Sequence, residues 1–282
     1  MPNITESLEK ADILLASVQI PESRREAGSL LCFVLKKDRV FLIAHPEYEL
    51  QVDEAELFDS IVKRRANREP FHHITGVKEF FGLDFVVSPD VLIPRPETEM
   101  LVARSIELLS RLDSPRFCEV GIGSGCIAVS VLHNISSTYG VGLDISEAAI
   151  GVARRNAANH DVLDRLTLLQ SDVFDELDQE RFDLIVSNPP YIPAKDIAGL
   201  QPEVKDFEPQ TALTDGGSGL SVIEKIVRRS PTFLKPGGFL LLEIGINQSA
   251  AVTEMFNPKV WDEIRTVPDF HGIPRMVCAV LI

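Results

Sequence analysis

The chain has 282 residues, with 28 Lys and Arg against 42 Asp and Glu, and its net charge at pH 7 is -14. Since a domain averages roughly 150 residues, the length indicates about two domains, and the 45% share of hydrophobic residues excludes a disordered or disulfide-stapled chain. The acidic excess argues against binding extended nucleic acid or an anionic membrane by charge, because such binding depends on Lys and Arg.

The first part of the chain has the hydrophobic spacing of helices. One-sided apolar stripes predict helices over 5–18, 22–36 and 53–68. We therefore expect a helical domain at 1–75. The third helix ends in a basic run, which suits the negative end of a helix dipole and consists of Lys63, Arg64, Arg65 and Arg68. We interpret this run as a solvated helix end in preference to a partner-docking patch.

Residues 76–96 are rich in β-formers and turn residues, which predicts a β-hairpin that links two domains. Beyond this hairpin, helical and strand patterns alternate. The predicted helices cover 97–112, 124–133, 146–159 and 218–230, and the predicted strands cover 116–121, 139–144, 166–171, 182–187 and 238–244, with two more strands in 260–282. The strands are continuously apolar, as strands buried on both faces must be, so 97–282 predicts an α/β fold with a doubly wound sheet.

Four scattered cysteines, with no C-x-x-C pair, predict buried thiols in a reducing compartment and no metal site. The N-terminus lacks a basic segment followed by an apolar run, and no segment approaches the roughly 18 apolar residues that span a bilayer. We expect a cytoplasmic protein without a membrane segment.

A glycine-rich turn follows the first strand of the α/β region. Glu119, Gly121, Gly123 and Gly125 form the pattern E-V-G-I-G-S-G, where glycines let a ligand approach the backbone closely. Dinucleotide dehydrogenases and plain turns share a bare G-x-G, but a pyrophosphate would not favour a carboxylate beside it. A cationic ligand tolerates Glu119 well, and S-adenosylmethionine carries both an ammonium and a sulfonium group.

Two further acids mark the next two strands: Asp144 ends the second strand, and Asp172 follows the third. Asp144 is placed to accept both hydroxyls of a ribose, and Asp172 to accept from an adenine amino group while Val173 packs nearby. The alternatives are a helix N-cap shared with Ser146 for Asp144 and an ordinary turn for Asp172. Three successive acidic strand ends favour a nucleoside, because ligands of open α/β sheets lie at the carboxyl ends of strands.

The segment Asn188-Pro189-Pro190-Tyr191 follows the fourth strand. Two prolines stiffen the backbone and leave free carbonyls, while Asn188 adds a side-chain oxygen. We expect the Asn188 oxygen and the Pro189 carbonyl to accept the two N–H bonds of a planar amino group, with Tyr191 as an aromatic wall. The alternative is a proline-stiffened loop without a catalytic role.

Together these motifs resemble those of class I S-adenosylmethionine-dependent methyltransferases that modify exocyclic or amide nitrogens. Asn-Pro-Pro-Tyr is shared by adenine-N6 DNA methyltransferases, guanine-N2 rRNA methyltransferases and the HemK/PrmC protein-glutamine methyltransferases. The segment LIPRPETE at 92–99, the helical domain, the hairpin and the closing DFHGIPR are similar to the HemK/PrmC family, and the similarity covers nearly the whole chain.

This resemblance implies a Rossmann-like sheet of seven strands in 97–282, substrate recognition by 1–75 and a linking hairpin at 76–96. It implies methylation of N5 of the glutamine in the Gly-Gly-Gln motif of peptide chain release factors, with no nucleic-acid substrate and no membrane partner. The implied cofactor contacts are Glu119, Gly121, Ile122, Gly123, Gly125, Asp144, Asp172, Val173 and Asn188, and the implied substrate contacts are Asn188, Pro189, Pro190 and Tyr191. Glu119 stands where the family usually has Asp.

Several residue roles stay open at this point, whereas the sequence favours the glutamine methyltransferase over three competing functions. Arg95, Glu97 and Thr98 fit a helix start as well as a cleft role, and we assign Glu243 and Arg275 structural roles. The competing functions are amino methylation of DNA or rRNA, an inactive binding protein and a dehydrogenase. An enzyme that acts on nucleic acid would have a basic face, and an inactive binding protein would have a damaged motif. A dehydrogenase would have a different glycine spacing.

Overall fold

The computed structural model describes residues 1–282 and divides into two compact units. The first unit comprises Met1–Gly76 together with the short segment Pro202–Phe207, and the second comprises Val77–Gln201 and Glu208–Ile282. The chain therefore leaves the second unit after Gln201 and returns to it at Glu208. No helix in the chain combines the length and the apolar character that crossing a membrane requires.

The first unit is helical. Its helices are α1 (Ile4–Ser17), α2 (Ser23–Leu35), α3 (Arg39–Ala44), α4 (Val52–Ala66), α5 (Phe71–Thr75) and α9 (Pro202–Lys205). A capping box begins α1, where the Asn3 side chain accepts from the Glu6 amide and the Glu6 side chain accepts from the Asn3 amide. At the start of α4 the Glu54 side chain accepts from the Gln51 amide over 2.8 Å. The three predicted helices are present within two residues of their predicted bounds, and the short helices α3, α5 and α9 were not predicted.

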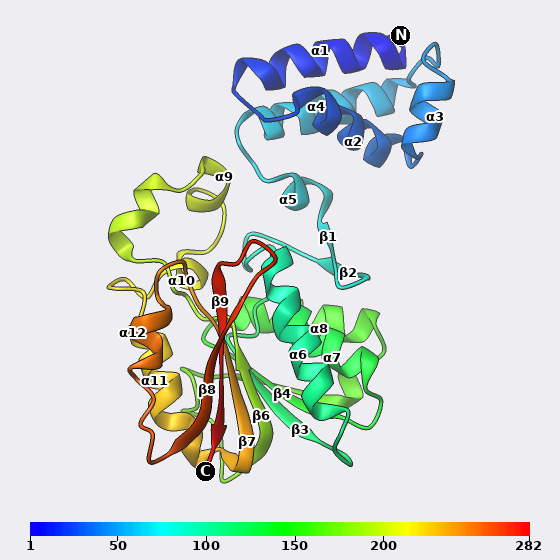
Figure 1. The fold of residues 1–282 in the computed structure, drawn as a ribbon. Coiled ribbons are helices and arrows are strands. Elements are labelled where there is room, and N and C mark those ends of the chain that lie inside the picture. Colours follow the sequence, from blue (N-terminus) through cyan, green and yellow to red (C-terminus); the bar gives the residue numbers. More distant parts are fainter. The chain divides into compact units, whose positions relative to one another are not determined.

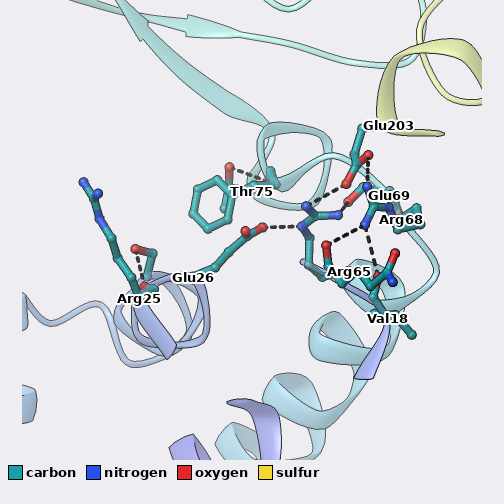
Figure 2. A network of polar contacts seen from close by, with 11 residues as sticks. Val18, Arg25, Glu26, Arg65, Arg68, Glu69, Thr75 and Glu203 are labelled. Atoms are coloured by element: carbon teal, nitrogen blue, oxygen red, sulfur yellow. Dashed lines mark hydrogen bonds and ion pairs between the residues drawn. The ribbon is translucent and has the colours of Figure 1, made fainter. Parts of the chain in front are cut away.

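The basic run at the end of α4 differs from its prediction. Arg65 is only 5% exposed; it is ion-paired with Glu26 and donates to Glu203 over 2.9 Å. Arg68 donates to the other oxygen of Glu203 over 2.7 Å, and Figure 2 shows these side chains converging. The interpretation as a solvated helix end is therefore wrong for Arg65 and Arg68, because acids from α2 and α9 neutralise them inside the unit.

The second unit begins with an antiparallel hairpin of β1 (Val77–Phe80) and β2 (Leu83–Val86), in which Val77 pairs with Val86. Its main sheet has seven strands in the order β5-β4-β3-β6-β7-β9-β8. The strands are β3 (Arg116–Val120), β4 (Tyr139–Asp144), β5 (Leu166–Gln170), β6 (Phe182–Ser187), β7 (Leu234–Glu243), β8 (Trp261–Pro268) and β9 (Pro274–Leu281). Strands β3 to β7 are parallel, and β9 runs antiparallel to both of its neighbours.

Helices cover both faces of this sheet (Figure 1). One face carries α6 (Glu99–Leu109), α7 (Cys126–Asn134) and α8 (Glu147–Asn159), and the other carries α11 (Ser221–Arg229) and α12 (Ser249–Thr253). Alternate strand residues serve the two faces: Leu184 and Val186 pack in the first core, and Ile185 packs in the second. This alternation explains why the strands are apolar throughout. The predicted doubly wound α/β fold with seven strands is confirmed.

The strand order reverses direction between β3 and β6. Ligands of doubly wound sheets bind where such a reversal leaves a crevice at the carboxyl ends of the strands. The segment between β6 and α11 contributes further short elements near this edge, the 3-10 helix η3 (Ala194–Gly199) and α10 (Gln210–Leu213). These elements are too short for a hydrophobic period, so the sequence did not predict them.

Candidate active site

The glycine turn after β3 has a backbone that only glycine adopts easily. Gly121, Gly123 and Gly125 have φ angles of 74°, 53° and 79°, in the left-handed region. The amides of Gly121 and Ile122 both donate to the carbonyl of Leu143 on β4, over 2.8 and 2.9 Å. The turn is thereby fixed against the end of β4, and its surface has no side chains at the glycine positions.

Two carboxylates, one buried and one partly buried, flank this turn. Glu119 is 1% exposed and accepts from the amide of Ala128 over 2.8 Å, and burial raises its pKa well above the ordinary value. Asp144 accepts from the amides of Gly123 and Ser146, both over 2.9 Å, and burial raises its pKa despite these bonds. Neither carboxylate is ion-paired in the structure. A ligand with a positive charge and hydroxyl groups would complement both of them.

Asp172 and Val173 lie beyond the end of β5. Asp172 is half exposed and pairs with Lys225 of α11 over 2.6 Å. Val173 is 6% exposed and has a φ of 57°, which is strained for a β-branched residue and is typical of functional sites. The Ser171 hydroxyl donates to the Val173 carbonyl over 3.1 Å and helps to hold this turn.

The Asn-Pro-Pro-Tyr segment continues from β6. A Cβ atom built on Gly121 would lie 3.9 Å from the carbonyl oxygen of Asn188, so this segment abuts the glycine turn. The side-chain amide of Asn188 donates to the Thr98 hydroxyl over 3.1 Å. The Tyr191 hydroxyl donates to Glu243 over 3.2 Å, and burial together with the Glu243 charge raises the pKa of Tyr191.

A cavity of about 260 Å³ joins these parts. The predicted residues that line it are Glu119, Gly121, Ile122, Gly123, Asp144, Asp172, Val173, Asn188 and Pro190, together with Arg95 and Thr98. Three predicted residues are outside this lining: Gly125 is the N-cap of α7, Pro189 is buried, and Tyr191 lies against Glu243. The structure thus brings the glycine turn, the acidic strand ends and Asn188 to one cavity.

The segment at 92–99 is held by two acids, of which Glu208 was not predicted and Glu243 was predicted to have a structural role only. Arg95 donates to Glu208 over 2.5 Å, and the amide of Ile93 donates to the other oxygen of Glu208 over 3.2 Å. The Thr98 hydroxyl donates to Glu243 over 2.7 Å. Glu243 ends β7, so the signal of an acid at a strand end, already used for Asp144, would also have selected it. No local pattern marks Glu208.

The sequence was compared with known proteins. It matches the PrmC N-terminal domain over residues 6–76 and the methyltransferase small domain over residues 100–202. A release factor glutamine methyltransferase of Geobacter sulfurreducens is 41% identical over 263 residues, which cover 93% of this chain and 91% of that protein. Another of Cereibacter sphaeroides is 40% identical over 276 residues, which cover 98% of each.

Solved structures support the fold. A methyltransferase from Pyrococcus furiosus has a TM-score of 0.53 and 18% sequence identity to this chain, and it covers 78% of this chain and 98% of its own. At this identity the similarity concerns the fold alone.

Proposed function

The chain belongs to the family of release factor glutamine methyltransferases, and from this membership we propose that it methylates N5 of the glutamine in the Gly-Gly-Gln motif of peptide chain release factors, with S-adenosylmethionine as the methyl donor. The observation that carries the proposal is the position of Asn188, whose carbonyl abuts the glycine turn and whose side chain lines the same cavity as Asp144. An amide-binding group and a nucleoside-binding cradle thus share one cavity.

The residues of the cavity fit S-adenosylmethionine. Gly121 and Gly123 offer an open backbone, Glu119 would face the positively charged part, and Asp144 would accept from the ribose. Asp172 and Val173 would hold the adenine, as expected from their place after β5. When bound, the cofactor supplies a methyl group on a positively charged sulfur. The raised pKa values of Glu119 and Asp144 agree with this assignment, because a nearby cation offsets the cost of burying their charges.

The chain activates its substrate by holding it. An amide nitrogen is a weak nucleophile, since its lone pair is delocalised into the carbonyl. The side-chain oxygen of Asn188 and the carbonyl of Pro189 accept its two N–H bonds, orient the nitrogen and stabilise the positive charge that develops on it. The proton becomes acidic as the new bond forms, so no strong base is needed beforehand. Pro190 and Tyr191 flank the glutamine side chain.

The helical unit provides substrate recognition in this proposal. Residues 1–75 would bind the release factor, and 76–96 would link them to the catalytic residues in 97–282. The match of 6–76 to the PrmC N-terminal domain supports this division. A release factor acts where translation terminates, so we expect the protein to work in the cytoplasm.

A methyl-transfer assay tests the proposal. Labelled S-adenosylmethionine is incubated with the protein and with purified release factor, whose Gly-Gly-Gln glutamine is intact or replaced by alanine. We expect label only on the intact factor, and we expect Asn188→Ala to lower kcat by about 10²–10³-fold, because one group that stabilises the transition state is lost. Asn159→Ala, a substitution at the exposed last residue of α8 and outside the cavity lining, is the matched control.

Duplex DNA and ribosomal RNA are assayed beside the release factor. Label on nucleic acid alone would overturn the substrate and leave the cofactor site in place. Equal labelling of the intact and alanine-substituted factor would place the methyl group on another residue. Binding of S-adenosylmethionine without transfer to any of these substrates would contradict the proposed activity.

A further inference from the structure

A continuous chain of hydrogen bonds runs from the end of β7 to Asn188. Glu243, the last residue of β7, accepts from the Thr98 hydroxyl over 2.7 Å through one oxygen. The Thr98 hydroxyl in turn accepts from the side-chain N–H of Asn188 over 3.1 Å. Glu243 is 3% exposed and Thr98 is 2% exposed, so water does not compete for these bonds.

The Thr98 hydroxyl has a single proton, and this fixes which group donates and which accepts in each of the two hydrogen bonds. An ionised carboxylate only accepts, so the single proton of the Thr98 hydroxyl is committed to Glu243. The Thr98 oxygen then has only lone pairs left for Asn188, and these select the NH2 end of the amide. The oxygen end of the Asn188 amide is consequently free to accept from a substrate.

We propose that Glu243 is a positioning residue, which acts through Thr98 to present the oxygen of the Asn188 amide to the glutamine of the substrate. This inference rests on the proposed function of Asn188 and assigns a role to two residues beyond it. A rotated amide would present N–H groups to the N–H groups of the substrate, and the two could not bond. The direction of one buried hydroxyl thus determines whether the site recognises an amide nitrogen.

The second oxygen of Glu243 holds Tyr191, which we expect to flank the substrate. It accepts from the Tyr191 hydroxyl over 3.2 Å, and the Tyr191 carbonyl accepts from Gln248 over 2.9 Å. A Cβ atom built on Gly219 would lie 2.1 Å from that carbonyl, so the loop after Asn188 is tightly enclosed. One carboxylate therefore orients the side chains of Asn188 and Tyr191, two of the groups that we expect to contact the glutamine.

The arrangement depends on the charge of Glu243. Burial raises the pKa of Glu243 to about 7 despite the bonds from Thr98 and Tyr191; Glu97 raises it further, and Arg275 lowers it. A protonated Glu243 can donate to Thr98, whose own proton is then free to point at Asn188 and rotate the amide. We therefore expect kcat to fall as the pH decreases below about 7.

Substitutions at Thr98 separate positioning from structure. Thr98 has no side-chain capping bond at the start of α6, so Thr98→Val removes the hydroxyl at nearly constant shape. We expect kcat to fall about 10–100-fold, with the KM for S-adenosylmethionine changed by less than about twofold. Thr98→Ser keeps the hydroxyl and should restore kcat.

Glu243→Gln should likewise lower kcat and should remove the decline below pH 7, because glutamine can donate to Thr98 and carries no titrating proton. Glu254→Gln, at an exposed acid after α12, is the control and should keep the activity and pH profile of the parent. A Thr98→Val enzyme with a kcat within about twofold of the parent would overturn the inference.

A second measurement is independent of methyl transfer. In protein labelled with 15N-asparagine, the Asn188 side-chain signals are identified by their absence in Asn188→Ala. We expect these signals to move with pH around a midpoint near 7, and this movement to vanish in Glu243→Gln. Signals that ignore both pH and this substitution would overturn the positioning role even if release factor is methylated. Signals that respond while release factor stays unlabelled would refute the proposed function alone.

Discussion

Glu203 in the helical unit is partly buried, with its side chain 14% exposed, and Glu243 in the α/β unit is 3% exposed, but the two carboxylates have opposite surroundings. Burial alone would raise the pKa of Glu203, but bonds from its own backbone, Arg65 and Arg68 lower it below its ordinary value. Burial also raises the pKa of Glu243, and the bonds from two neutral hydroxyls do not offset this effect. The first carboxylate is neutralised by guanidinium groups, and the second keeps an uncompensated charge.

This difference indicates that the Glu203 cluster stabilises the fold, whereas Glu243 serves the chemistry of the site. Guanidinium forks bind carboxylates in one geometry, so the cluster in Figure 2 ties α2, α4 and α9 together within the helical unit. The Glu243 site lacks such a partner and destabilises the folded state at neutral pH. Proteins accept such costs at sites where a strained or charged group serves function.

Removing the guanidinium at the centre of the helical cluster should have the largest effect. Arg65→Met leaves Glu26 without its ion-pair partner, and it leaves Glu203 with Arg68 alone. We expect the helical unit to lose roughly 3–5 kcal/mol of stability, the usual cost of breaking a buried ion pair. Hydrogen exchange at the amides of α4 measures this loss, because exchange in the core of the unit requires its unfolding.

The matched control is Arg64→Met, one residue earlier on the same helix. Arg64 is 44% exposed and pairs with Glu69 over 2.6 Å, so solvent screens the pair, and we expect a loss below about 1 kcal/mol. Equal losses in the two variants would show that burial of Arg65 is not the source of the stability.

Glu243→Gln should reveal the cost of the second carboxylate. A pKa that rises from 4.5 to about 7 on folding stabilises the folded state below pH 4.5, and this contribution is lost as the pH rises through about 7. Relative to the parent, the variant should therefore gain roughly 3 kcal/mol between pH 4.5 and pH 8. Fluorescence of Trp261, the only tryptophan and a core residue of the α/β unit, follows the unfolding in denaturant.

The comparison between variant and parent isolates Glu243, since Glu119 and Asp144 titrate in both proteins. A pH-independent difference would show that Glu243 does not titrate as its burial requires. A loss of kcat in a variant that is more stable at pH 8 would fit a functional role, whereas a structural role would lower both.

Local sequence patterns predicted the part of the site that depends on strand order. Glu119 and Asp144 lie at the ends of apolar strands, and Asp172 follows a third strand. Parallel strands bring their carboxyl ends to one edge of a sheet, and these three residues line one cavity there. The spacing of glycines likewise predicted a tight turn, and in the structure three glycines of this turn have positive φ angles.

Partners that are distant in the sequence could not be predicted in this way. Thr98 and Glu243 are 145 residues apart, and Arg65 and Glu203 are 138 residues apart. No period of 2 or 3.6 residues encodes such a pairing. The basic end of α4 was misinterpreted for this reason. Its local sequence shows a helix with basic residues, but it does not show that Glu203 of α9 pairs with Arg65 and Arg68.

An exposed ion pair of equal length should have the smallest effect. Lys10 and Asp59 are 2.9 Å apart, the same distance as Arg65 and Glu203, but their side chains are 73% and 46% exposed against 6% and 14%. Water and salt screen the exposed pair, so Asp59→Asn should cost less than about 1 kcal/mol by the same hydrogen-exchange measurement.

This cost should shrink further when the salt concentration rises from about 0.05 to 0.5 M, because the screening length becomes shorter than the distances over which surface charges interact. The cost of Arg65→Met should hardly change over that range, since ions do not enter a buried cluster. Equal declines with salt in the costs of Asp59→Asn and Arg65→Met would show that solvent reaches the Arg65 cluster. Glu203 and Glu243 would then differ in the number of charged partners and not in the burial of those partners.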